Sequence, residues 1–151
     1  MFNFASRFKG LRGKFLPAAV VLVCLATSAA AELPPYVYRD MQAKSPERLT
    51  IKVKSVKTEE RDEPERKLIA VTAEAEVVEV ERTASGLKPG QTIRIRYTRT
   101  EYKEPIAGPS QVPILREGET CPAFLGKNKD ADTYAPAAGG YSFHAVEPDK
   151  R

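Results

Sequence analysis

The sequence predicts an all-β domain, a small closed barrel of five strands of which one is long and bent. Short stretches of alternating apolar and polar residues recur along the chain, whereas helical periodicity is convincing nowhere after residue 31. Glycine and proline divide the last third into segments that leave room only for short strands. Short strands, one bent strand and irregular connections together favour a small barrel.

The first 31 residues have the features of a cleavable secretory signal. Four basic and no acidic residues precede an apolar stretch at 16–26, which is shorter than the roughly 20 residues of a membrane-spanning helix. Small residues end the segment, so we expect cleavage after Ala31 and export to a bacterial periplasm or the outside. A lipid anchor at Cys24 is the alternative, and it is disfavoured because Val23 stands where a small residue is wanted.

Removal of that signal changes the net charge of the chain. Of the 24 basic residues four lie in the signal, which holds none of the 20 acidic residues, so the exported chain has 20 of each. A domain without net charge lacks the basic surface that nucleic acid requires. We therefore expect no nucleic-acid partner, no stable membrane insertion after cleavage and no cofactor. Cys121 has no second cysteine in the exported chain, so no internal disulfide can form.

The exported chain is expected to have three parts. An extended arm is predicted at residues 32–48, because Pro34 and Pro35 keep a chain out of both helices and sheet ladders. The barrel is predicted at 49–146, and a short polar tail at 147–151.

The first strand of the barrel is predicted at residues 49–57, where apolar and polar residues alternate with a period of two. The residues expected to point inward are Leu49, Ile51 and Val53. The following run at 58–66 is charged and is broken by Pro64, so we expect a solvated loop there.

The long bent strand is predicted at residues 67–82. The apolar residues change parity at Val77 and Val78, which is what a β-bulge produces in a strand with two different faces. Turn residues follow, and the strand at 93–97 then completes a predicted hairpin. The expected cross-strand pairs are Val80 with Ile95, Val78 with Tyr97, Glu81 with Arg94, and Glu79 with Arg96.

Two further strands are predicted in the last third of the chain. The first covers residues 121–125, and Pro122 places it at an edge or at a strand start. The second covers residues 140–146 and closes the barrel.

Six segments of the barrel region carry a resemblance to a known fold. They are Ala75–Val80, Gly86–Gly90, Ile93–Tyr97, Gly118, Ala123–Leu125 and Tyr134. Their order resembles an OB-fold of the netrin-module type, which includes the tissue inhibitors of metalloproteinases. The resemblance covers residues 49–146 and implies a barrel that binds proteins. It does not imply protease inhibition, because those inhibitors begin with a zinc-chelating cysteine, whereas this exported chain begins with Glu32.

We expect the function to be non-catalytic binding of another envelope or extracellular protein. A proline pair pre-orders an extended segment that can add to a groove of a partner. The predicted partner-binding residues are Leu33, Pro34, Pro35 and Tyr36.

A second interpretation places a carbohydrate or polyanion site on the barrel face. Arginine and tyrosine together form the lining on which barrels of this kind bind sugars and oligonucleotides. The residues of this alternative site are Arg94, Arg96, Tyr134 and Tyr141.

Two other kinds of chemistry are weighed and disfavoured. Cys121 and the sole histidine, His144, are the residue types of a thiol hydrolase, but no motif brings them together. Glutamates on the bent strand offer oxygen ligands for a cation, yet stiff strands seldom make six or more such ligands converge. Arginines opposite supply ordinary partners for them, so we expect no metal site. The four glutamates are Glu74, Glu76, Glu79 and Glu81.

Overall fold

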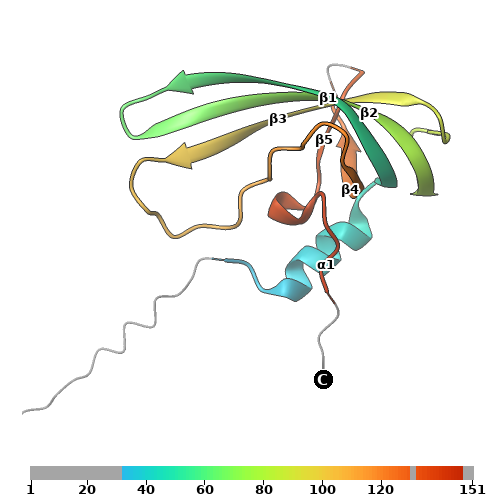
Figure 1. Ribbon diagram of the computed structural model, residues 1–151. Coiled ribbons are helices and arrows are strands. Elements are labelled where there is room, and N and C mark those ends of the chain that lie inside the picture. Colours follow the sequence, from blue (N-terminus) through green and yellow to red (C-terminus); the bar gives the residue numbers. More distant parts are fainter. Residues whose placement is uncertain (1–31, 130–131, 148–151) are drawn as a thin grey trace, which may run out of the picture.

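The computed structural model describes residues 32–129 and 132–147, and these residues form a closed five-stranded barrel with one helix against it (Figure 1). The predicted signal peptide at 1–31 and all but residue 147 of the predicted tail lie outside the described residues. The elements are α1 (Pro35–Lys44), β1 (Glu47–Asp62), β2 (Arg66–Arg82), β3 (Thr92–Tyr102), β4 (Thr120–Lys127), β5 (Tyr134–Pro136) and a 3₁₀ turn, η1 (Gly139–Tyr141).

The strands follow one another around the barrel in the order β1-β2-β3-β5-β4, and β4 pairs with β1 to close it. Every pair is antiparallel except β3 with β5, which is parallel. This all-β architecture confirms the predicted fold class, a small OB-like barrel. In the part of the chain that the structure describes, no helix is long and apolar enough to span a membrane.

The core lies inside the barrel and consists of one cluster of apolar side chains. The inward-facing residues predicted on the first strand, Leu49, Ile51 and Val53, are at most 4% exposed and belong to it. Tyr97 packs against the same cluster and donates its hydroxyl hydrogen to the carbonyl oxygen of Pro113 at 2.7 Å. The predicted alternation of inward and outward faces is therefore confirmed for these strands.

The predicted bulge in the long strand is also confirmed. Along β2, Val77 is fully buried whereas Val78 is 47% exposed, and the pairing with β1 skips one residue there, from Ile51 opposite Val77 to Thr50 opposite Glu79. A second bulge lies on β1 at Lys54. Bulges of this kind bend a strand, and here they turn β1 and β2 around the barrel.

The predicted pairing of the hairpin is wrong by seven residues. Ile95 faces Ala73 instead of Val80, and Arg94 faces Glu74 instead of Glu81. The other two predicted pairs, Val78 with Tyr97 and Glu79 with Arg96, shift in the same way, to Val71 with Tyr97 and Thr72 with Arg96. The physical reason is the bend at Val78, since the end of β2 beyond it pairs only with β1.

The charged run predicted as a loop is instead the far end of a long hairpin. β1 continues to Asp62 and β2 starts at Arg66, which leaves only residues 63–65 as a turn (Figure 1). The apolar residues Ile69 and Val71 of β2 are buried here, and β1 pairs with them through its backbone. A strand therefore forms although most of its own side chains lie in solvent.

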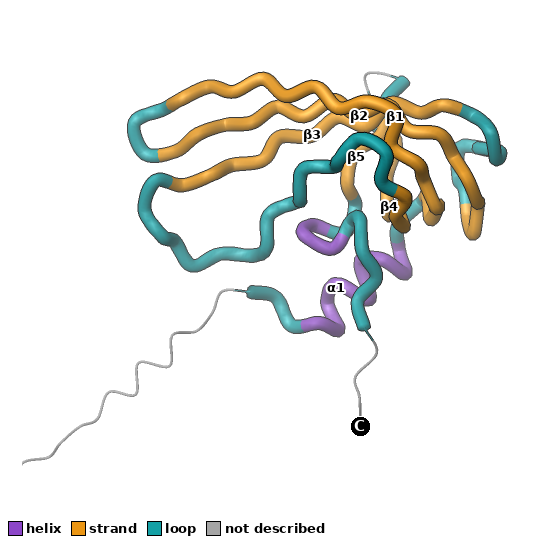
Figure 2. The backbone as a smooth tube through the Cα atoms, in the orientation of Figure 1, coloured by secondary structure: helices purple, strands orange, loops and turns teal. Residues whose placement is uncertain are grey.

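The extended arm predicted at residues 32–48 is contradicted, because α1 forms there and Glu47 already belongs to β1. Pro35 occupies the first helical turn, where the missing N–H costs no hydrogen bond. Tyr38 and Gln42, one turn apart, are the buried residues of α1. Figure 2 shows α1 next to the 3₁₀ turn beneath the barrel.

The strand predicted at residues 121–125 is confirmed as part of β4, but the closing strand predicted at 140–146 is wrong. β5 lies earlier, at Tyr134–Pro136, and the chain then forms η1. Gly139 has a φ of +53°, which ends any extended run at this point. Gly140 packs so closely on Ser110 that an added Cβ would lie 2.4 Å from the Cβ of that serine.

Candidate functional site

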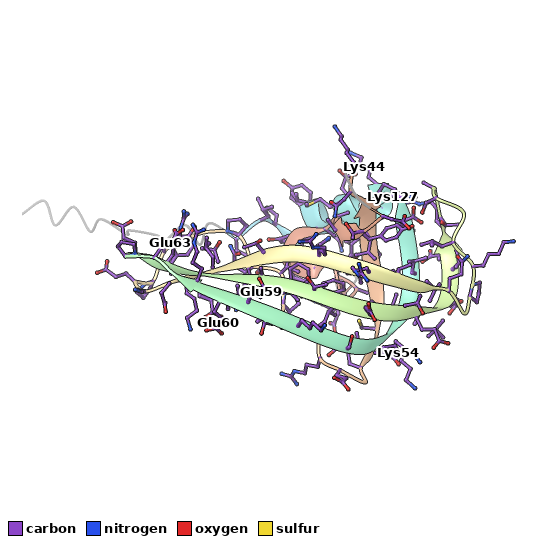
Figure 3. The ribbon with its side chains drawn as sticks, turned by 90° about the horizontal axis from the view of Figure 1, so that it is seen from above. Lys44, Lys54, Glu59, Glu60, Glu63 and Lys127 are labelled. Carbon is purple, nitrogen blue, oxygen red and sulfur yellow. The ribbon has the colours of Figure 1, made fainter. Side chains whose placement is uncertain are left out.

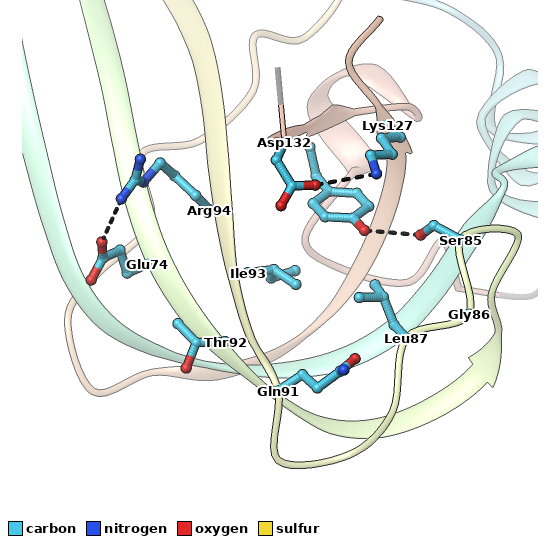
Figure 4. Close-up of a pocket in the computed structure, with 11 residues that line it drawn as sticks. Glu74, Ser85, Gly86, Leu87, Gln91, Thr92, Ile93, Arg94, Lys127 and Asp132 are labelled. Carbon is cyan, nitrogen blue, oxygen red and sulfur yellow. Dashed lines mark hydrogen bonds and ion pairs between the residues drawn. The ribbon is translucent and has the colours of Figure 1, made fainter. Parts of the chain in front are cut away.

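A groove of about 600 Å³ opens on the barrel wall where β3 meets β5 (Figure 4). The two strands share a single pair, Ile95 with Tyr134, so the wall is weakly closed here. The lining residues come from β2 and β3, the loop between them, and the segment from the end of β4 to β5. They are Glu74, Ser85, Gly86, Leu87, Gln91, Thr92, Ile93, Arg94, Lys127, Asp132 and Tyr134.

A chain of hydrogen bonds fixes one side of this groove. The hydroxyl groups of Tyr134 and Ser85 lie 2.9 Å apart, and the Ser85 hydroxyl donates to Oε1 of Glu47 at 2.7 Å. The backbone N–H of Ser85 donates to the same oxygen at 3.0 Å. Glu47 is only 1% exposed, and its second oxygen, Oε2, has no hydrogen-bond partner among the described residues. A buried carboxylate thus fixes, through Ser85, the hydroxyl of Tyr134, a residue that is itself only 4% exposed.

Two ion pairs border the groove. Arg94 contacts Glu74 at 3.2 Å, and Lys127 contacts Asp132 at 3.2 Å (Figure 4). The hydrogen bond to Asp132 and the charge of that carboxylate raise the pKa of Lys127 above its usual value. The rim therefore has both hydrogen-bond donors and acceptors, and the groove is also lined by the apolar residues Leu87 and the buried Ile93.

A second hollow of about 250 Å³ adjoins the groove on the outer face of β1, β2 and β3. It shares Arg94 and Glu74 with the groove, and its other lining residues are Ser55, Lys57, Thr72 and Arg96. Thr72 of β2 pairs with Lys57 on one side and with Arg96 on the other. Three cationic side chains and one carboxylate line this hollow, so it is net positive.

Of the four residues predicted for a carbohydrate or polyanion site, the structure brings three together. Arg94 and Tyr134 line the groove, and Arg96 lines the adjoining hollow. Tyr141 lies elsewhere, with its ring 4.4 Å from that of Tyr38 on α1 and 4.4 Å from that of His144. Its place in η1 rather than in a strand explains the difference.

Sequence reasoning missed several residues of this site. The sequence pattern places Ser85 in a turn and Glu47 in the predicted arm, so neither residue points to a site. Lys57 was expected on the first strand, but without a groove beside it. Lys127 lies in β4, two residues beyond the predicted strand. These residues come together only through the long-range pairing of β1, β2 and β3, and the local sequence pattern does not specify that pairing.

The residues predicted to bind a partner lie at the start of α1. Leu33 is 37% exposed and Tyr36 is 65% exposed, while Pro34 and Pro35 cap and begin the helix. Glu32 precedes them and accepts hydrogen bonds from the hydroxyls of Ser110 and Tyr38, each at 2.6 Å. These bonds lower the pKa of the Glu32 carboxyl group.

The thiol of Cys121 is in the wrong environment for a nucleophile. Burial and the neighbouring Glu119 raise its pKa to about 12, whereas a reactive cysteine needs a lowered pKa. His144 packs on the ring of Tyr141 instead of contacting this thiol.

The glutamates of β2 have cationic partners. Three of the four form ion pairs, namely Glu74 with Arg94, Glu76 with Lys54, and Glu81 with Arg48. Within residues 32–129 and 132–147, no cluster of acidic, histidine and cysteine side chains could hold a metal ion.

The strand order and the position of the groove define the class of the domain. It is a closed OB-like barrel with a groove between β3 and β5 and an adjoining hollow on the outer face of β1, β2 and β3. Barrels of this class bind oligosaccharides and oligonucleotides on the face of their second and third strands. Comparisons with protein-family models, with curated proteins and with solved structures give no match.

Proposed function

We propose that the protein is an exported, non-catalytic binding module that holds an acidic oligosaccharide in the groove beside β3. The observation that carries the proposal is that a groove with donors and acceptors on its rim, floored by the buried Tyr134, adjoins a hollow that Arg94 and Arg96 line on the outer face. Export follows from the signal expected at residues 1–31, and a non-catalytic role is consistent with the raised pKa of Cys121.

The composition of the groove favours a sugar over a plain polyanion. A polyphosphate chain has charge on every unit and no hydroxyl groups along its length, so in the groove it would meet the carboxylates of Glu74 and Asp132 with like charge alone. Sugar hydroxyls, in contrast, both donate and accept hydrogen bonds, so they suit a rim of mixed groups. The acidic groups of the ligand are expected over the adjoining hollow, where Arg96 has no ion-pair partner among the described residues.

Calorimetric titration with a tetrasaccharide of galacturonic acid tests this proposal. A neutral tetrasaccharide of glucose and linear polyphosphate serve as the comparison ligands. We expect binding of the acidic sugar. The neutral sugar is expected to bind at least about tenfold more weakly, because it lacks a charge-assisted hydrogen bond of about 1.5–3 kcal/mol. Polyphosphate is expected to bind at least about tenfold more weakly because it has no hydroxyl groups along the chain to donate to Glu74 and Asp132. Equal binding of polyphosphate would contradict the sugar site, and the absence of any binding would contradict the groove as a whole.

Two variants locate the ligand on the protein. Arg94→Gln and Arg96→Gln each remove a cation from the outer face and are expected to weaken binding about tenfold or more. Lys88→Gln removes the same charge from an exposed loop position and is the matched control, for which we expect unchanged affinity. Equal losses in all three variants would mean that only the overall charge matters.

A second candidate function is binding of another envelope protein through the start of α1. The exposed apolar side chains of Leu33 and Tyr36 favour it, because exposed aromatic and aliphatic residues anchor protein interfaces. The resemblance to netrin-type barrels points in the same direction. Affinity capture from envelope fractions, compared with the Leu33→Ala/Tyr36→Ala double variant, tests it. Capture of the same protein by both forms would exclude this surface.

A further inference from the structure

One edge of the sheet has no partner along much of its length. β4 pairs with β1 only from Glu47 to Lys52, and the last backbone contacts on that side join Val53 to Gly118 and Glu119 at 2.9 Å each. Within the described residues, β1 from Ser55 to Asp62 pairs only with β2. Figure 3 shows β1 as the outermost strand of the long hairpin, with Glu59 and Glu60 along it.

The backbone groups on this edge are suited to pairing with another strand. The turn at the end of the hairpin has a hydrogen bond from the N–H of Glu63 to the carbonyl oxygen of Arg66 at 2.8 Å. Because the groups of an antiparallel strand alternate in direction, the N–H and C=O of residues 56, 58 and 60 point away from β2. These groups are a ready template for an added strand.

The charges along the same edge are self-complementary. Lys57 and Glu59 are both exposed and share the outer face, with Thr58 between them. If two copies of β1 pair antiparallel about Thr58, Lys57 of each copy faces Glu59 of the other. Pairing about Lys57 or about Glu59 would instead place two like charges opposite each other, which is unfavourable.

We propose that the protein forms a two-fold symmetric dimer in which the β1 edges of two copies pair antiparallel about Thr58. The hydrogen bonds of residues 56, 58 and 60 and two pairs of Lys57 with Glu59 hold the copies together. Strands β1, β2 and β3 of each copy then join into one sheet of six strands. The outer faces of the two copies lie on the same side of this sheet. The contact is confined to one strand edge, so the dimer is a weak one that depends on protein concentration.

The experiment is sedimentation equilibrium of the purified protein over a range of concentrations, with charge exchange at the edge. Lys57→Glu and Glu59→Lys each convert two attractive pairs into two repulsive ones, and each is expected to weaken dimerisation at least about tenfold. The double variant Lys57→Glu/Glu59→Lys restores opposite charges and is expected to return to within about threefold of the original protein. Lys88→Glu changes the net charge equally at an exposed loop and is expected to leave dimerisation unchanged.

A backbone variant tests the pairing without any charge. Thr58→Pro removes an N–H that points away from β2, so the ladder within the chain keeps its hydrogen bonds while the dimer loses its central pair. We expect a monomer with an unchanged circular dichroism spectrum. Three results would overturn the proposal. The original protein could be monomeric at about 1 mM, or the double variant could dimerise as weakly as the single variants. The third is a Lys88→Glu variant that dimerises as weakly as Lys57→Glu.

Discussion

The most informative stability prediction concerns Gln42, whose amide joins α1 to the end of the chain. Its Nε2 group donates to the carbonyl oxygens of Tyr141 and His144, each at 2.8 Å, and its Oε1 accepts from the N–H of Val146 at 3.4 Å. The side chain is 7% exposed, so water replaces few of these bonds when the amide is removed. Gln42→Ala therefore removes the side-chain donor from the carbonyl groups of Tyr141 and His144.

The magnitude follows from the two short bonds. A hydrogen bond contributes about 0.5–1.5 kcal/mol net, so the two short bonds together contribute about 1–3 kcal/mol. We expect Gln42→Ala to lower the free energy of unfolding by about this amount. The control is Asp40→Ala on the exposed side of α1, which loses only an ion pair with Lys44 and is expected to cost about 0.5 kcal/mol or less.

The assay is urea unfolding followed by circular dichroism, with the midpoint and the slope compared between variants. A lower midpoint at an unchanged slope for Gln42→Ala, together with an unchanged midpoint for Asp40→Ala, is the expected result. If both variants unfold at the same urea concentration as the original protein, the amide does not stabilise the contact between α1 and the chain end.

Three further predictions concern the bulge, the thiol and a close contact. Val77→Thr buries a hydroxyl group in the core and is expected to lower the free energy of unfolding in urea by about 1–3 kcal/mol. Val78→Thr on the exposed side is expected to change it by no more than about 0.5 kcal/mol. Equal losses in the two variants would contradict the bulge. Cys121 in the folded protein is expected to react with a thiol reagent at pH 7 about a thousandfold more slowly than in urea, because its pKa is about 12. The Cys121 thiol loses its proton near pH 8.5 in the unfolded chain but only near pH 12 in the folded protein, so the free energy of unfolding is expected to fall as the pH rises between these values. In thermal melts at different pH values, Cys121→Ala is expected to show a smaller decrease in stability over this range. Gly140→Ala is expected to cost about 1–3 kcal/mol because the added Cβ meets a neighbouring loop, while Gly126→Ala has open space and serves as its control in the same melts.

Local burial was predictable from the sequence. Alternation with a period of two identifies the inward faces of Leu49, Ile51 and Val53, because each side chain either enters the core or does not. The parity change at Val77 and Val78 locates a bulge for the same reason. These features depend on residues a few positions apart, so a single sequence contains the information.

Pairing over longer distances was not predictable. The turn residues after β2 are compatible with several registers, and the bend at Val78 selects one that lies seven positions away from the expected one. The helix α1 was missed because its buried residues are a tyrosine and a glutamine one turn apart, which makes no apolar stripe. Burial of Gln42 depends on carbonyl groups about 100 residues away, and no local pattern reveals such a partner.

The candidate site likewise contains residues that the sequence identifies and residues that only the fold brings to it. The combination of arginine and tyrosine pointed to Arg94, Arg96 and Tyr134. The structure places the two arginines on one outer face, whereas Tyr134 is buried and reaches only the floor of the adjoining groove. Glu47 and Ser85 support the tyrosine from segments that are distant in sequence, so their part in the site appears only in the folded chain.

The central claim is that the groove beside β3 binds an acidic oligosaccharide, and a single titration tests it most directly. Heteronuclear NMR spectra of the isotope-labelled protein are recorded while the tetrasaccharide of galacturonic acid is added. If the sugar binds in this groove, the backbone amide signals that shift are those of Ser85, Thr92, Arg94, Arg96 and Lys127. Unchanged spectra at millimolar sugar, or shifts confined to residues 33–36, would contradict it.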